Sequence, residues 1–295
     1  MTETHGTVMP SRRQILSLCV PPCLSAALPV LPARAAGSGL ALTTILDGEA
    51  ALLRGETRLQ LTEGVALQAD DIVELPEKSG RLLRIEFADG LCLDLGPGAR
   101  TLLAPRLPGE RGRARAYLLG GWAKLTLPPK GQPALLLTPG FDAGGIDGNA
   151  VLAALPDGAG QAFAEAGRIE LRMAGAAPIA LKTNEWMSLP PAGGKPVVHP
   201  HPGPAFVQQV PRPFLDPLPS RAALFAGKER TPKSVGMISY ADAQDWMDNP
   251  DPALRRLALT RWRGLLRSNE FRAGALMGLK AHPEWQPLLF PPQAK

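Results

Sequence analysis

The chain has 295 residues, of which 45% are apolar and 20% are charged, and its formal net charge is +5. This composition excludes a wholly disordered chain, and the lack of repeated long apolar runs excludes a membrane protein with many spans. Three cysteines are too few for a small disulfide-stabilised scaffold. We therefore expect a globular protein of one or two domains.

Residues 1–35 have the pattern of an export signal. Arg12 and Arg13 precede an apolar stretch, and Ala33-Arg34-Ala35 places small residues at the two positions that a signal peptidase reads. The segment resembles a twin-arginine signal, which implies a cleaved leader and a periplasmic mature protein. The alternative is an uncleaved membrane anchor, which four prolines within the apolar stretch disfavour because they interrupt a spanning helix.

Residues 36–190 alternate between apolar and polar side chains, with turn residues between the runs. Around the turn Ala88-Asp89-Gly90, the alternation predicts a hairpin. One face of this hairpin carries the side chains of Leu83, Ile85, Phe87, Leu91 and Leu93. Further hairpins are indicated near Gly158 and Gly175. We expect a mainly β domain, folded as an antiparallel sandwich or a rolled sheet.

Cys92 is the one cysteine that remains after cleavage of the predicted signal, so it has no partner for an intramolecular disulfide. The histidines of the mature chain are His199, His201 and His282, all far away in sequence. We interpret Cys92 as a plain strand residue rather than a nucleophile.

Residues 191–233 are expected to form a Pro-rich linker, since eleven prolines stand between positions 190 and 232. Such a density prevents regular strand pairing and favours an extended, solvated connector. His199 and His201 form a His-x-His pair within it. No cysteine or carboxylate lies close by to complete a ligand set, so we expect no metal site there.

Residues 234–295 change to a helical period, which predicts a small C-terminal helical domain. Ser239 and Asp242 have the spacing of a capping box, and Asn249 or Asp251 can cap a second helix with a proline in its first turn. A third helix is expected from Asn269. One apolar face consists of Leu254, Leu257, Ala258, Trp262, Leu265 and Leu266.

Positive charge is concentrated at this helical end. Residues 212–295 hold 13 Lys and Arg against 8 Asp and Glu, whereas residues 36–211 hold 16 against 18. On helical spacing, four arginines lie mostly off the apolar face: Arg255, Arg256, Arg263 and Arg267. They are either a solvated helix surface or the residues that bind an acidic partner surface or anionic headgroups.

The β region carries a pattern of turn and core residues over about half of the 295-residue chain. A Gly-led strand in Leu46–Gly55 is followed by an Asp-Asp-Ile turn in Leu67–Val73 and by the Phe-Ala-Asp-Gly hairpin of Leu83–Leu95. Thr138-Pro139 and Glu165-Ala166-Gly167 occupy comparable places in the second half. This pattern resembles the FecR-like domain.

The resemblance implies a periplasmic domain that passes a signal from an outer-membrane receptor to a sigma factor. Such regulators also carry a cytoplasmic segment and a retained transmembrane helix, whereas only 14 residues precede the apolar run here. We therefore expect a stand-alone exported protein whose FecR-like domain is a non-catalytic binding, regulatory or scaffold module. Its expected partner is another envelope protein. Nucleic acid is not expected as a partner, and contact with a membrane is expected to be peripheral at most.

The alternative function is association with the cell wall or a polysaccharide, including hydrolysis. A glycosidase needs two carboxylates that face each other across a cleft. The acids of the hairpins fit solvated strand faces better than a glycosidase site. The histidines lie in the linker and at a helix end, where they are poorly placed for a Ser-His-Asp site. These acids are Glu86, Asp94, Asp142 and Asp147. We expect no enzyme activity and no cofactor.

Two further patterns have a simple and a functional interpretation. The segment 142–149 has spaced oxygen ligands for calcium, but its glycines fit a turn, and it lacks the ligand spacing of an EF-hand. A second segment contains four arginines that are either exposed loop charges or an anion-binding loop: Arg106, Arg111, Arg113 and Arg115.

Overall fold

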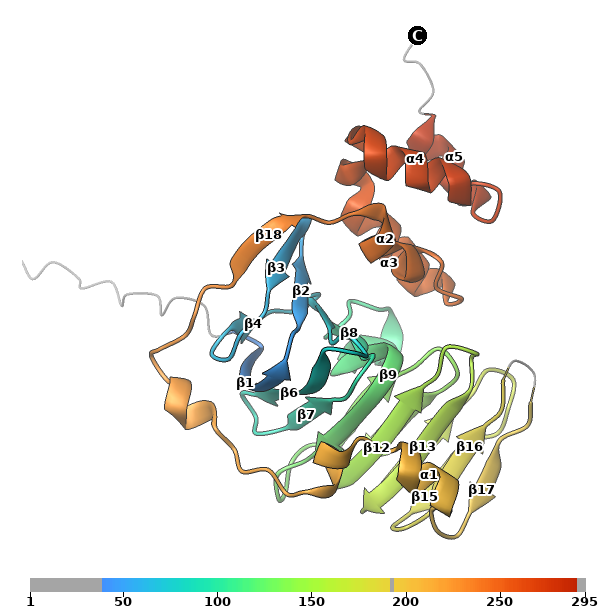
Figure 1. Cartoon of the computed structure of the whole chain (residues 1–295). Coiled ribbons are helices and arrows are strands. Elements are labelled where there is room, and N and C mark those ends of the chain that lie inside the picture. The colour runs from blue at the N-terminus through green and yellow to red at the C-terminus, as the bar shows by residue number, and fades with distance from the viewer. Residues whose placement is uncertain (1–38, 192–193, 291–295) are drawn as a thin grey trace, which may run out of the picture. The chain divides into compact units, whose positions relative to one another are not determined.

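The alternating segments form two layers of strands in the computed structural model, which describes residues 39–191 and 194–290 (Figure 1). The predicted export signal lies outside the described residues. In sheet A, hydrogen-bonded neighbours are β4 (Ala66–Leu67), β1 (Ala41–Gly48), β6 (Gly80–Phe87), β7 (Cys92–Leu95), β9 (Ala116–Thr126), β12 (Asn149–Ala154), β13 (Gly160–Ala166), β16 (Trp186–Leu189) and β17 (Val197–His199).

Sheet B contains the first half of β9, which therefore belongs to both sheets. Its neighbours, in hydrogen-bonded order, are β18 (Lys233–Met237), β3 (Thr57–Gln60), β2 (Ala51–Arg54), β5 (Ile72–Glu74), β8 (Arg100–Leu103), β9, β10 (Ala134–Leu137), β11 (Asp142–Ile146), β14 (Arg168–Arg172) and β15 (Ile179–Lys182). These pairings are antiparallel except that of β9 with β10. The expected mainly β, antiparallel fold followed by C-terminal helices is confirmed.

β9 passes from sheet B to sheet A at Gly120 and Gly121. Gly121 has φ +81°, and a Cβ atom there would lie 2.4 Å from the backbone nitrogen of Ala99. A side chain would therefore clash with the backbone and strain the bend. Glycine at this corner lets one strand bring the inner faces of both sheets onto a shared core.

The shared core takes the inward side chains of both sheets. Leu83, Ile85, Phe87, Leu91 and Leu93 are all buried in it, as the alternation around Gly90 predicts. β6 and β7 pair in the expected register, with Leu83 opposite Leu95 and Ile85 opposite Leu93. Because side chains alternate between the two faces of a strand, a shift of one residue in this register would turn these five side chains away from the core.

The Pro-rich segment is mostly exposed, as the proline density predicts, but it also docks on the sheet through a few buried side chains. Between β17 and β18, it forms α1 (Pro204–Gln209) and the short 3-10 helices η2 (Arg212–Leu215) and η3 (Ala222–Phe225), which have four residues each. Phe206 and Phe214 are buried on the outer face of sheet A, against Trp122 and Val151. The prediction that the segment forms no strand pairs and makes no packing contacts was wrong, because β17 pairs with β16 between two prolines and the aromatic side chains pack on the sheet.

The helical end consists of α2 (Tyr240–Met247), α3 (Pro252–Trp262), η4 (Arg263–Arg267), α4 (Asn269–Gly278), η5 (Pro283–Trp285) and α5 (Gln286–Leu289). The capping box of Ser239 and Asp242 is confirmed, and Asp251 caps α3 with Pro252 in its first turn. None of the helices among residues 39–290 that the structure describes is long and apolar enough to cross a membrane.

Candidate functional site

The helical end is anchored on the outer face of sheet B by its apolar face. Trp246, Leu254 and Trp262 are buried in one cluster with Ile72 and Tyr117 of the sheet. This cluster is separate from the core between the sheets. The outer face of sheet B is therefore covered by the helices, and the opposite side of α3 is left to solvent.

Polar contacts fix the orientation of α3 on the sheet. The indole Nε1 of Trp262 donates to the carbonyl oxygen of Gly55 at 3.1 Å, and Arg261 donates to the carbonyl oxygens of Leu53, at 2.7 Å, and Asp70. Burial lowers the pKa of Arg261, against the opposing effect of the nearby carboxylates of Asp71 and Asp70. Arg261 therefore positions the helix.

A second set of contacts holds the start of α3. The amide of Asn249 donates to the hydroxyl of Tyr117 at 2.9 Å, and Arg111 donates to the carboxylate of Asp251 at 2.6 Å. Burial raises the pKa of the Tyr117 phenol, so that this group stays neutral. Both ends of α3 are thus tied to sheet B, and its outward side chains have fixed positions.

Two adjoining hollows of about 460 Å³ and 400 Å³ run along this outward side, and we call them together the arginine groove. They share Thr260, Arg263 and Leu288. The complete lining is Glu56, Pro252, Arg255, Arg256, Leu259, Thr260, Arg261, Arg263, Gly264, Leu266, Arg267, Glu284, Pro287 and Leu288. The four arginines selected from the sequence all belong to it.

Those four arginines differ in their partners. Arg255 is half-buried and donates to Glu284 and to the carbonyl oxygen of Asn249, each at 2.8 Å. Arg256, Arg263 and Arg267 are exposed, and none of them has an ion-pair partner within residues 39–191 or 194–290. Three arginines are therefore available to a ligand, and Arg255 is held by the protein itself.

The sequence did not indicate the apolar part of the groove. Leu259 of α3 and Leu288 of α5 lie among the arginines, with prolines at both walls. Leu288 keeps 41% of its surface exposed. The groove thus combines positive charge with accessible apolar surface, and α5 contributes because it folds back beside α3.

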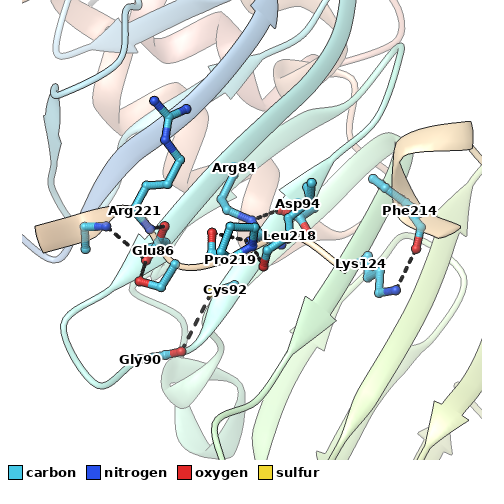
Figure 2. A network of polar contacts seen from close by, with 12 residues as sticks. Arg84, Glu86, Gly90, Cys92, Asp94, Lys124, Phe214, Leu218, Pro219 and Arg221 are labelled. Atoms are coloured by element: carbon cyan, nitrogen blue, oxygen red, sulfur yellow. Dashed lines mark hydrogen bonds and ion pairs between the residues drawn. The ribbon is translucent and has the colours of Figure 1, made fainter. Parts of the chain in front are cut away.

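On the other side of the molecule, a buried polar network holds the connector on sheet A (Figure 2). Arg84 and Asp94 pair through two hydrogen bonds of 2.6 and 2.7 Å, and Arg84 also donates to the carbonyl oxygen of Leu218 at 2.6 Å. Lys124 donates to the carbonyl oxygen of Phe214 at 2.7 Å. The connector therefore supplies hydrogen-bond partners for charged side chains of the sheet.

Glu86 is part of this network. Its carboxylate accepts hydrogen bonds from the Ser220 hydroxyl and, at 2.8 and 3.4 Å, from the backbone N–H groups of Arg221 and Ala222. Glu86 and Asp94 are only 4% and 2% exposed. The expectation that both are solvated strand residues is wrong, because residues 214–222 cover that face of the sheet.

The remaining acids predicted as solvated also have protein partners. Asp142 pairs with Arg111 at 3.1 Å, and Asp147 pairs with Arg168 at 3.0 Å. Burial raises the pKa of Asp142, and Arg111 opposes that rise. Both acids lie in the segment weighed as a calcium site, and their carboxylates bind arginines.

Of the three histidines, His199 and His282 have partners within the protein, and His201 is exposed. His199 stacks on Trp186 with 4.4 Å between ring centroids, and His282 contacts Asp248 at 2.6 Å. Burial raises the pKa of the half-buried Cys92 thiol to about 11, so thiolate is scarce at neutral pH. Within the part of the chain that the structure describes, no group of three or more metal-binding side chains is present.

The basic loop that the sequence suggested is largely neutralised. Arg106 pairs with Asp70 at 2.8 Å, Arg111 with Asp142 and Asp251, and Arg115 with Asp89. Arg113 is exposed. The loop therefore presents far less free charge than its four arginines indicate.

Another hollow, of about 690 Å³, was not predicted and lies beside the bend of β9. Its floor is rich in glycine and proline, and Arg100 pairs with Asp245 of α2 beside it. Burial raises the pKa of Glu74 in its wall, with Arg58 opposing the rise. Its charged groups are mostly paired, so the arginine groove is the better candidate for binding a ligand.

No protein-family model and no curated protein matches the chain. It is similar to two crystal structures, at 1.65 and 2.50 Å resolution, described as "a putative anti-sigma factor from Parabacteroides distasonis ATCC 8503". Each match has 16% identity and covers 44% of this chain and 59% of the other, with TM-scores of 0.37 for the 1.65 Å structure and 0.38 for the 2.50 Å structure. The likeness thus spans less than two thirds of those chains.

Proposed function

We propose that the protein is a non-catalytic regulatory or scaffold protein of the periplasm that contacts another envelope protein. The observation that carries this proposal is the arginine groove, where Arg256, Arg263 and Arg267 stand beside apolar surface without ion-pair partners within the described ranges. Unpaired arginines next to apolar side chains are typical of protein-binding surfaces.

Two features of the sequence support the location and the class. Arg12-Arg13 and the small residues before position 36 fit a twin-arginine signal. The FecR-like pattern of Leu46–Leu95 suits a domain that transmits or organises contacts in the envelope. The chemistry-bearing side chains outside the groove are mostly bound to one another, which is consistent with a structural role for them.

The test is cross-linking in intact cells followed by purification of the full chain and identification of the linked proteins. We expect an envelope protein that is linked to the wild type and lost when Arg256, Arg263 and Arg267 are changed to Gln. In parallel, replacing Arg12-Arg13 by Lys-Lys should abolish delivery to the periplasm. Fractionation that finds the wild-type chain outside the periplasm, or cross-linking that finds no envelope protein, would contradict the proposal.

A further inference from the structure

We propose that the arginine groove binds an acidic amphipathic helix of the partner protein. The inference rests on the proposed function and specifies the chemistry of the partner. It follows from three properties of the groove: the spacing of its free arginines, the apolar residues between them, and the secondary structure of its walls.

The free arginines lie along one line. Arg256 lines the first hollow, Arg263 lines both and Arg267 lines the second, so the three follow the groove in chain order, and all three are exposed. With a rise of about 1.5 Å per residue in α3 and about 2 Å in η4, they span about 18 Å. About 12 residues of a partner helix cover that length.

The positive charge of the groove exceeds its own negative charge. Among the groove's own glutamates, Glu284 is held by Arg255 at 2.8 Å. Glu56 lies at the η4 end, where a Cβ atom on Gly264 would be 2.1 Å from its carboxylate. The groove therefore carries more arginine than carboxylate, and carboxylates of a ligand gain favourable contacts beside each free arginine.

Apolar surface lies between the charges. Leu259 occupies α3 between Arg256 and Arg263, and Leu288 of α5 faces the shared part of the two hollows. A purely acidic ligand would leave this apolar surface in water. An amphipathic helix that carries leucine-like side chains between its carboxylates satisfies both the charges and the apolar surface.

The walls favour a helix over a strand. The lining comes from α3, η4, η5 and α5, with Glu56 as the one contribution from a turn between strands. Helical walls offer no row of free backbone N–H and C=O groups, which strand addition requires. The ligand must therefore be recognised through side chains, at helical spacing.

The test measures binding of a stapled helical peptide to the full chain by fluorescence anisotropy. A staple is needed because an isolated helix of this length is marginal in water. The peptide carries glutamates at i, i+7 and i+11 and leucines at i+3 and i+4. The comparison peptide has the same composition with the glutamates distributed around the helix.

We expect the patterned peptide to bind at least about tenfold more tightly than the comparison peptide. Its affinity should fall as added salt screens the charges. Changing Arg256, Arg263 and Arg267 to Gln should reduce its affinity at least about tenfold. The matched control changes the exposed residues Arg81, Arg113 and Arg212 to Gln, which removes the same charge elsewhere and should leave binding unchanged. Circular dichroism checks that both variants fold.

Leu288→Ser distinguishes binding of an amphipathic helix from simple charge attraction. The variant keeps every arginine, but it should still reduce the affinity for the patterned peptide. Equal binding of the two peptides, or equal loss in the control variant, would overturn the inference. So would stronger, groove-dependent binding to vesicles that contain phosphatidylglycerol than to the peptide, since that outcome assigns the groove to a lipid surface.

Failure of this inference is distinguishable from failure of the proposed function. If an envelope protein is cross-linked but the patterned peptide does not bind the groove, the proposed function stands and the helical ligand is rejected. If the peptide binds as expected but no envelope protein is cross-linked in cells, the groove chemistry stands and the proposed function is rejected.

Discussion

Glu86 shows how the environment of a single carboxylate changes its contribution to stability. The side chain is 4% exposed and accepts hydrogen bonds from Ser220, Arg221 and Ala222. Burial alone would raise the pKa of Glu86, but these hydrogen bonds outweigh it and hold the pKa below the ordinary value of 4.5. The ionised carboxylate is therefore the form that the folded protein stabilises.

We predict that Glu86→Gln lowers the free energy of unfolding at pH 7 by about 1–3 kcal/mol, since it weakens charge-assisted hydrogen bonds. Because the pKa is depressed in the folded state, this contribution is present above pH ~4.5 and is lost as the pH falls through the folded pKa. Urea titrations between pH 3 and 7 should show the difference between wild type and variant shrinking at acidic pH. Glu49→Gln, at an exposed site, is the control. A constant difference across this range would contradict the prediction.

At the scale of an element, the connector shows that aromatic side chains can hold a proline-rich segment on a sheet. Phe214 is 1% exposed and packs on sheet A, while the adjacent Leu215 is 48% exposed. The carbonyl oxygen of Phe214 also accepts a hydrogen bond from Lys124 at 2.7 Å. The two neighbours in sequence therefore contribute very differently to docking.

Phe214→Ala should loosen the connector. If undocking of the connector destabilises the whole fold, the free energy of unfolding should fall by about 3–5 kcal/mol. We expect faster proteolytic cleavage within residues 204–225 in this variant, because local opening exposes the backbone. Leu215→Ala provides the matched control and should be cleaved like the wild type. Equal cleavage of the two variants would show that the segment is not held by Phe214.

At the scale of the whole molecule, the sheets and the C-terminal helices share buried contacts. Trp262 is 1% exposed, and its indole donates to the carbonyl oxygen of Gly55 in the turn between β2 and β3. β18 also pairs with β3 just before α2 begins. Residues 39–191 and 194–290 accordingly belong to one compact unit.

We predict that the helices unfold together with the sheets. Trp262→Ala should lower the free energy of unfolding by about 3–5 kcal/mol. The unfolding transitions followed by far-ultraviolet circular dichroism and by tryptophan fluorescence should shift together. Met277→Ala, at a site 88% exposed on α4, should leave both unchanged. An early loss of helix signal with the β signal intact would instead support independent domains.

The sequence alone determined the features that depend on neighbours within a few residues. The face of the hairpin around Gly90, the caps of α2 and α3, and the helical face with Leu254 and Trp262 follow from periods of two and 3.6 residues, which the backbone geometry imposes. The four arginines of the candidate site were found in the same way, since their spacing places them off the apolar face.

Only the tertiary structure decided which surfaces meet. Arg84 and the carbonyl oxygen of Leu218 are 134 residues apart in sequence, and no local period indicates their contact. The same holds for Leu288, which reaches the arginines of α3 only because α5 folds back beside that helix. Burial of Glu86 and the apolar part of the groove were therefore hidden from the sequence, because long-range packing and not local periodicity selects the partners of an outward side chain.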